Sequence, residues 1–129
     1  MPLSATPRLH VDYADLLAVP FVLGGEDQDT GLDCLGQARV LLARIGLVLP
    51  AGRPWEWLGP SSAVILGREW RAATQAGDLL VSESHGMGVH VSTMLDPASG
   101  LVITTTTAGA RTGKAWAIQG LTGVWRVGS

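Results

Sequence analysis

Apolar residues recur at helical spacing in one stretch of the chain, residues 34–45. Four of them stand at intervals of three, four and three residues, so they would lie on one face of an α-helix. These positions are Leu35, Ala38, Leu42 and Ile45. Asp33 precedes the stretch, where an N-cap accepts backbone hydrogen bonds, and Gly46 follows it, where a left-handed residue ends a helix. The pattern predicts a helix from about Cys34 to Ile45.

The chain before this helix is expected to be mostly irregular. Residues 1–19 form a lead-in segment, with one short helix in the apolar patch Tyr13–Val19. An extended piece follows at residues 21–25 and ends on paired glycines, and residues 26–30 form a polar loop.

The second half of the chain changes from helical to strand-like patterns. A second helix is expected from Ser61 or Ser62 to about Ala73, and its expected buried positions are Val64, Ile65 and Trp70. Strands are expected at residues 79–82, 89–95, 101–107, 115–119 and 124–127, with turns at 84–88 and 96–100. Helices in the first half and antiparallel strands in the second predict one α+β domain spanning residues 1–129.

The composition narrows the class of protein. Hydrophobic residues make up 47% of the 129 residues and charged residues 16%, a balance that predicts a folded core. The net charge of -2 argues against binding to nucleic acid, which favours a basic surplus. The longest apolar run, Leu16–Leu23, contains Pro20 and is far shorter than the roughly 20 residues that cross a bilayer. The first fifteen residues contain Asp12 and Asp15 and no apolar run, so neither a transmembrane segment nor a secretory signal is expected.

Cys34 is the only cysteine, which excludes an internal disulfide and a zinc cluster of several cysteines. It is predicted to stand in the first helical turn, where unpaired N–H groups and the helix dipole stabilise a thiolate. Gly31 lets the backbone turn into the helix, and the Cys34 amide could donate to a developing oxyanion. Cys34 is therefore a candidate nucleophile; the alternative is a small buried core residue.

A nucleophilic thiol needs a base, and the chain has three histidines. His10 falls in the lead-in segment and His85 in a glycine-rich turn, where solvated histidines are usual. His90 lies between Val89 and Val91 near the start of a strand, so the sheet fixes its direction. His90 is the candidate base; the alternative is a histidine hydrogen-bonded within the sheet.

A third polar group usually orients such a base. If the turn at residues 96–100 places Leu95 opposite Leu101, then His90, Thr104 and Thr106 share one face of the sheet. Thr104 or Thr106 could then accept a hydrogen bond from the imidazole. The alternative is that the threonine run reflects only strand propensity.

Four segments, taken together and in order, resemble those of NlpC-type cell-wall cysteine peptidases. The form Gly-Leu-Asp-Cys and the small size look most like versions found with bacteriophage tail proteins. The segments are Pro20-Phe21-Val22-Leu23-Gly24-Gly25, Gly31-Leu32-Asp33-Cys34-Leu35-Gly36, Gly77-Asp78-Leu79-Leu80 and His90-Val91-Ser92-Thr93-Met94-Leu95.

The resemblance implies a papain-like α+β fold, with N-terminal helices packed on a C-terminal antiparallel sheet. It implies that Cys34 is the nucleophile, His90 the general base and Thr104 the third catalytic residue. It also implies a substrate site that includes Phe21, Gly25, Asp33 and Ser92.

The activity implied by the resemblance is hydrolysis of amide bonds in peptidoglycan stem peptides, next to D-glutamate or diaminopimelate. The protein would act in the virion, among phage tail-tip proteins, and help the particle penetrate the cell wall. Phe21 and Leu35 depart from the family's usual Tyr and its Ser or Trp, and Thr104 stands where His, Asn or Gln is common. These departures favour the alternative, a weakly active or inactive structural subunit of a tail tip. That alternative predicts an interface that involves Trp55, Trp57 or Trp116.

Two other functions have less support in the residues. A single cysteine offers no resolving thiol for redox sensing. His85 and His90 lack a third ligand in an evident pattern, although Glu83 and Asp96 are near in sequence. No metal and no cofactor are therefore expected.

Overall fold

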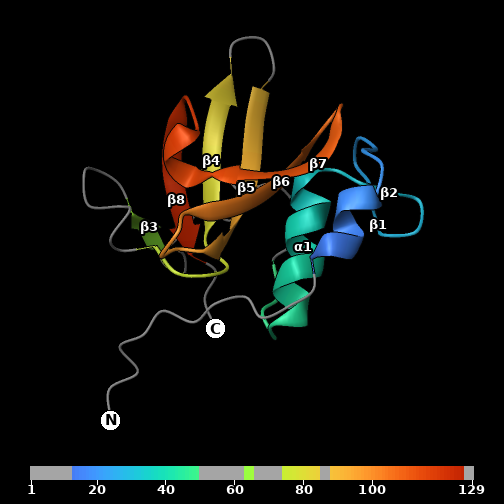
Figure 1. Cartoon of the computed structure of the whole chain (residues 1–129), viewed down its shortest axis with the longest axis horizontal. Coiled ribbons are helices and arrows are strands. Elements are labelled where there is room, and N and C mark those ends of the chain that lie inside the picture. Colours follow the sequence, from blue (N-terminus) through green and yellow to red (C-terminus); the bar gives the residue numbers. More distant parts are fainter. Residues whose placement is uncertain (1–12, 50–62, 66–73, 85–87, 127–129) are drawn as a thin grey trace.

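The structure is a computed structural model that describes residues 13–49, 63–65, 74–84 and 88–126 (Figure 1). Its helical segments are the 3-10 helices η1 (Ala14–Ala18) and η3 (Ala115–Ala117) and the α-helix α1 (Cys34–Arg44). Its strands are β1 (Glu26–Asp27), β2 (Gly31–Leu32), β3 (Ala63–Ile65), β4 (Leu79–Ser84), β5 (Gly88–Asp96), β6 (Leu101–Thr106), β7 (Gly109–Lys114) and β8 (Leu121–Arg126).

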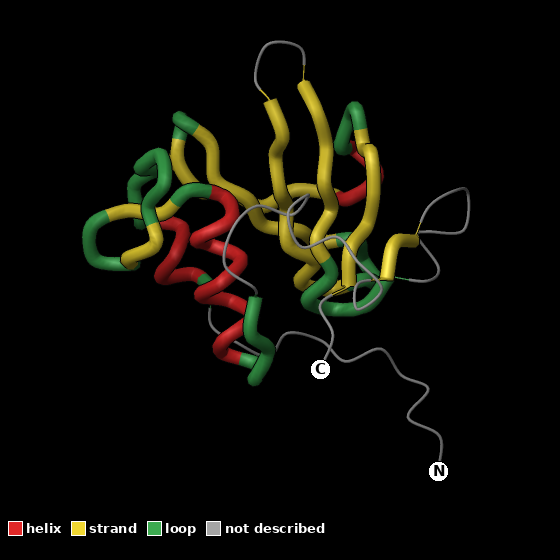
Figure 2. The backbone as a smooth tube through the Cα atoms, turned by 180° about the vertical axis from the view of Figure 1, so that it is seen from behind, coloured by secondary structure: helices red, strands yellow, loops and turns green. Residues whose placement is uncertain are grey.

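In the described part of the chain, six strands form one antiparallel sheet in the order β3-β8-β4-β5-β6-β7. Strands β4 to β7 follow one another as hairpins, whereas β8 returns to lie between β3 and β4. The short hairpin β1-β2 lies beside α1, away from the centre of the sheet (Figure 2). The fold is therefore a sheet with one long helix and a small hairpin at its side.

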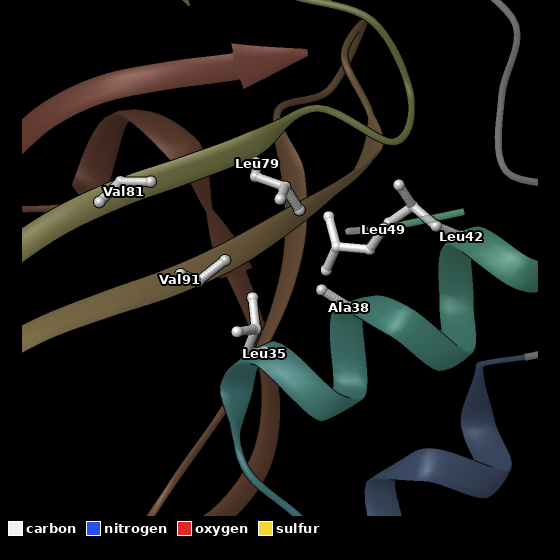
Figure 3. Close-up of a cluster of buried hydrophobic side chains, with 7 residues drawn as sticks. All are labelled: Leu35, Ala38, Leu42, Leu49, Leu79, Val81 and Val91. Atoms are coloured by element: carbon white, nitrogen blue, oxygen red, sulfur yellow. The ribbon is translucent and has the colours of Figure 1, made fainter. Parts of the chain in front are cut away.

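The core between α1 and the sheet forms where one face of the helix packs on one face of the strands. Side chains from α1 and the segment after it pack on alternate residues of β4 and β5 (Figure 3). The cluster consists of Leu35, Ala38, Leu42, Leu49, Leu79, Val81 and Val91. A neighbouring cluster joins η1, α1, β5 and β6 through Leu16, Leu41, Leu95 and Ile103.

The intervening residues of the strands form a further buried cluster. It contains Leu80, Met94, Val102, Ala115 and Val124. Because successive residues of a strand point to opposite faces, this cluster lies on the side of the sheet away from α1. Both faces of the sheet are thus covered by apolar side chains.

The predicted boundaries of α1 are confirmed to within one residue. Asp33 caps the helix, because its carboxylate accepts from the Gly36 amide at 2.7 Å. Gly46 follows the last turn with φ +81°, a left-handed conformation that glycine adopts without strain. The helix ends at Arg44 rather than Ile45.

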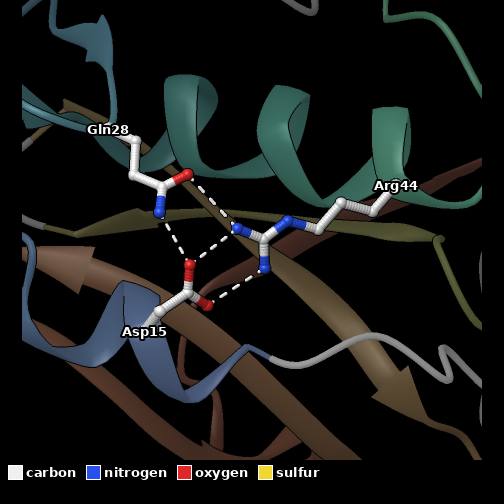
Figure 4. Close-up of polar contacts among 3 residues, drawn as sticks. All are labelled: Asp15, Gln28 and Arg44. Carbon is white, nitrogen blue, oxygen red and sulfur yellow. Dashed lines mark hydrogen bonds and ion pairs between the residues drawn. The ribbon is translucent and has the colours of Figure 1, made fainter.

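A polar network joins η1, the turn after β1 and the end of α1 (Figure 4). Arg44 donates to both carboxylate oxygens of Asp15, at 3.1 and 2.8 Å, and to Gln28 Oε1 at 3.2 Å. Gln28 Nε2 donates to Asp15 at 2.7 Å. The hydrogen bonds from Arg44 lower the pKa of Asp15. The predicted short helix in the lead-in is present as η1 and is held to α1 by these bonds.

Four sequence expectations about secondary structure are wrong. Residues 22–25 form a turn, in which the Gly25 amide donates to the Val22 carbonyl at 2.8 Å, rather than part of an extended piece. Residues 63–65 form strand β3, paired with β8, rather than part of a helix at 61–73; the remainder of that expected helix, including Trp70, lies outside the described residues. Residues 115–117 form η3 rather than a strand, and the strand lies just before them as β7. The expected polar loop at 26–30 is the β1-β2 hairpin and its turn.

Candidate active site

Cys34 is the first residue of α1 and is half-buried against the sheet. It packs against the buried cluster that contains Val91 of β5, and the Val91 backbone acts to lower the pKa of its thiol. The sharp approach to the helix depends on Gly31, whose φ is +147° and whose missing Cβ would overlap the side chain of Val22. The helix start therefore places the sulfur against the main chain of the strand that carries His90.

The segment before β1 is fastened to the first turn of α1. The amide of Asp33 donates to the Gly25 carbonyl at 3.1 Å, and the Asp33 carboxylate accepts from the Gly24 amide at 3.2 Å. The Gly25 carbonyl lies where a side chain on Gly36 would stand. Asp33 thus links this segment to the helix as well as capping the helix, and Gly36 provides the space for the contact.

His90 and Thr104 are joined by a hydrogen bond of 2.6 Å between Nε2 and Oγ1. The Thr104 hydroxyl also donates to the Val91 carbonyl at 2.8 Å. Because a hydroxyl has one proton, Thr104 accepts from His90, and Nε2 therefore carries the imidazole hydrogen. The lone pair of the neutral ring is then on Nδ1.

The hairpin between β5 and β6 contains an irregularity that the sequence does not predict. Leu95 is not opposite Leu101, because a register shift between Met94 and Asp96 places Asp96 there. The pair Met94–Val102 nevertheless keeps the expected register, so the alternation that predicts His90 and Thr104 on one face is preserved.

Thr106 makes different contacts from Thr104. It pairs with Gly109 of β7, and its hydroxyl accepts from the Ala108 amide at 3.1 Å. Thr106 thus stabilises the turn between β6 and β7. Of the two threonines considered from the sequence, Thr104 is the one that contacts His90.

The peptide unit of Val91 is the point where these groups converge. Cys34 packs against the cluster that contains Val91, and the Val91 carbonyl accepts from Thr104. His90 is the residue directly before Val91. Contacts from α1 and β6 therefore meet at Val91, and His90 is linked to this point through Thr104.

Burial controls the protonation of both candidate catalytic groups. Burial raises the pKa of the Cys34 thiol, the Val91 amide partly offsets this rise, and the charge of Asp33 adds to it. Burial also lowers the pKa of His90. Desolvation is the largest of these effects and acts against the thiolate that the helix N-terminus is expected to favour. Both shifts favour the uncharged forms, a thiol and a neutral imidazole.

The site contains a thiol, an imidazole and a polar group that orients the imidazole, which are the groups that a cysteine nucleophile uses. A neutral imidazole with a lone pair on Nδ1 can accept a proton, and Thr104 limits the rotation of the ring. The N–H of Cys34 belongs to the first helical turn, whose amides have no acceptor within the helix.

The remaining candidate residues have mainly structural contacts. Phe21 is half-buried and forms a bridge with Leu32. Gly25 and Asp33 hold the segment before β1, as described above. Ser92 is only 3% exposed and lies opposite Leu80 within the sheet, so its burial argues against the expected contact with a substrate.

Sequence reasoning missed two contributors to the site, the Val91 peptide and Gly36. The Val91 contribution comes from the backbone and leaves no signature in residue type. Gly36 could have been found, because a glycine inside the first helical turn is unfavourable unless a close contact requires it. His10 and His85 lie outside the described residues.

Within residues 13–49, 63–65, 74–84 and 88–126, no group of three or more His, Cys, Asp or Glu side chains is arranged to hold a metal ion. Among the helices of the same residues, none has the length and apolar character needed to cross a membrane.

Comparison with solved structures identifies the fold. The chain resembles the NlpC/p60 domain of the peptidoglycan hydrolase SagA, with a TM-score of 0.61 and 24% identity over 89% of this chain and 92% of that chain. It also resembles a Staphylococcus aureus protein described as similar to a lipoprotein of the NLP/P60 family, with a TM-score of 0.65 and 22% identity over 98% of this chain and 45% of that chain. No family model and no curated protein sequence matches the chain. The chain therefore has the papain-like α+β fold of NlpC/p60 domains.

Proposed function

We propose that the protein is a cysteine peptidase that hydrolyses amide bonds in the stem peptides of peptidoglycan. The observation that carries the proposal is the hydrogen bond between His90 and Thr104, beside the Val91 backbone near which Cys34 begins α1. The substrate class is supported by the structural neighbour SagA, whose NlpC/p60 domain belongs to a peptidoglycan hydrolase.

The reaction begins from the neutral pair. As the Cys34 sulfur attacks the substrate carbonyl, Nδ1 of His90 accepts the thiol proton and the carbonyl oxygen becomes an oxyanion near the Cys34 amide. The imidazolium then gives this proton to the leaving amine, and the acyl-enzyme forms. Water, deprotonated by His90, attacks the thioester and releases the carboxylic acid and the free thiol.

Thr104 acts in this scheme as a positioning residue. Its hydroxyl is fixed by the Val91 carbonyl and holds Nε2–H, so Nδ1 keeps the lone pair. A threonine hydroxyl carries no charge and stabilises the imidazolium less than a carboxylate would. We expect Thr104→Val to lower kcat about 10-fold to 100-fold with little change in KM, and Thr104→Ser to retain most of the activity.

The direct test is the release of muropeptide fragments from purified peptidoglycan by wild type, Cys34→Ala and His90→Ala. Both substitutions should reduce the rate to background while circular dichroism shows a folded protein. Thr106→Val is the matched control for Thr104→Val, because Thr106 serves the neighbouring turn. Equal product from wild type and Cys34→Ala would refute a cysteine peptidase.

We further infer that the peptidase works as a component of a bacteriophage tail tip. The support is the Gly31-Leu32-Asp33-Cys34 form of the nucleophile segment, which resembles the versions found with phage tail proteins. Mass spectrometry of purified particles tests this location. Detection of the protein only in cell lysate, and never in particles that contain their other tail proteins, would contradict it.

The alternative is a structural tail subunit with little or no turnover. Phe21 and Thr104 favour it, since both replace more polar groups usual in the family. Trp116, one of its predicted interface residues, is 44% exposed, whereas Trp55 and Trp57 lie outside the described residues. If Cys34→Ala particles assemble and infect as wild type does, the structural function is favoured over the catalytic one.

A further inference from the structure

Between α1 and the sheet lie three buried side chains whose oxygen atoms have no hydrogen-bond partner in the described part of the chain. Gln37 and Thr93 are each 1% exposed and Thr105 is 2% exposed. The unpartnered atoms are Gln37 Oε1 and the Oγ1 atoms of the two threonines. Buried polar atoms are costly without a hydrogen bond, and in folded proteins they are paired with protein groups or ordered water.

The course of α1 over the sheet determines where Gln37 lies. Cys34, Gln37 and Leu41 are spaced at i, i+3 and i+7, so they form one stripe along the helix. At one end of the stripe, Cys34 contacts the Val91 backbone. At the other end, Leu41 belongs to the buried cluster that contains Leu95. Gln37 therefore lies over the part of β5 between Val91 and Leu95.

Both threonines belong to that part of the sheet and to the same face. Thr93 is paired with Ile103, and Ile103 packs in the cluster that contains Leu41, on the helix side. Thr105 is two residues from Ile103 along β6 and therefore shares its face. The topology thus gathers the polar atoms of Gln37, Thr93 and Thr105 in one layer beneath α1.

We propose that this layer is a binding site for an ordered internal water molecule. The hydroxyls of Thr93 and Thr105 donate to the water oxygen, and the water donates to Gln37 Oε1. These bonds satisfy all three side-chain oxygens, and three is about the number of hydrogen bonds that a buried water makes. The water attaches the second turn of α1 to β5 and β6, one turn beyond the nucleophile.

Thermal denaturation of Thr93→Val distinguishes a hydrated layer from a dry one. In a hydrated layer the substitution removes a partner of the water, and the melting temperature falls by about 2–8 °C. In a dry layer it removes an unpartnered hydroxyl, and the melting temperature rises instead. Thr112→Val is the matched control, since Thr112 is exposed on β7 opposite Ile103; it should change the melting temperature by much less than Thr93→Val does in either direction.

A crystal structure of the wild-type protein at high resolution provides the second measurement. The proposal requires a density peak within hydrogen-bonding distance of Gln37 Oε1 and both threonine hydroxyls. A higher melting temperature for Thr93→Val, or a crystal structure in which these atoms bond directly to protein groups, would overturn it. This test does not depend on the enzymatic activity.

Discussion

The ion pair between Asp78 and Arg126 offers the sharpest test of what holds the sheet together. Arg126 lies at the end of β8 and donates through Nε and Nη2 to the two carboxylate oxygens of Asp78, at 3.1 and 3.0 Å. The amide of Gln75 donates to the same carboxylate at 2.8 Å. The Asp78 side chain is 2% exposed and the Arg126 side chain 31% exposed.

Arg126→Met keeps much of the aliphatic stem and removes the cation. The buried carboxylate then retains the Gln75 amide as its described partner. Breaking a fully buried ion pair costs about 3–5 kcal/mol. Because nearly a third of Arg126 is exposed, water can reach the pair, and we expect a smaller loss of about 2–3 kcal/mol. This is a large part of the roughly 5–15 kcal/mol that stabilises an ordinary domain.

Urea denaturation followed by tryptophan fluorescence measures this loss. Asp78→Asn and the double variant complete a mutant cycle, and the double variant should lose clearly less free energy of unfolding than the sum of the single variants. Arg111→Met, on the exposed part of β7, is the matched control and should lose less than about 0.5 kcal/mol. An Arg126→Met variant within about 1 kcal/mol of wild type, or additive losses in the cycle, would refute the reasoning.

Four further predictions concern the site and its supports. Burial raises the pKa of Cys34, so the pH dependence of alkylation by iodoacetamide should have its midpoint above the ordinary thiol value of about 8.5. A midpoint well below that value, as for an activated thiolate, would contradict this. Burial lowers the pKa of His90, so the ring stays neutral as the pH falls. We expect kcat/KM to be lost only below about pH 6.5, the ordinary pKa of histidine. An acidic limb above that pH would argue against His90 as the base. Asp33→Ala should reduce the free energy of unfolding in urea by about 0.5–2 kcal/mol, and Asp33→Asn by less, because asparagine also caps helices. Gly36→Ala should lower the melting temperature, because its Cβ would overlap the Gly25 carbonyl; the higher melting temperature expected from helix propensity alone would count against the close contact.

Local signals explain why α1 is predictable from the sequence. Its start depends on Asp33 and its end on Gly46, and both residues act on backbone groups within a few positions of themselves. The apolar spacing between them then defines the buried face. Each of these signals can be read without knowledge of the tertiary structure.

The errors fall where long-range pairing decides the structure. Val64 and Ile65 fit a helical face as well as a strand, and β3 exists because these residues pair with residues 124 and 125 of β8, about 60 positions away. A three-residue strand at a sheet edge has little periodicity of its own. The same limitation applies to β7, whose sequence is rich in polar residues and glycine.

The candidate site was predictable as far as it depends on side-chain alternation. His90 and Thr104 share a face because a strand has a period of two, and the irregularity at Leu95 leaves that period intact between His90 and Met94. The state of the thiol was not predictable, because it depends on how deeply Cys34 is buried. Position at a helix N-terminus alone suggests a lowered pKa, whereas desolvation raises it.

The position of β8 between β3 and β4 has a consequence for how the chain is made. During synthesis the hairpins from β4 to β7 emerge from the ribosome before residues 121–126 do. Until then β4 has an open edge, and β3 has no neighbour in the sheet. The nascent chain must therefore protect an unpaired strand until residues 121–126 emerge, and a product that stalls before them would expose that edge to aggregation.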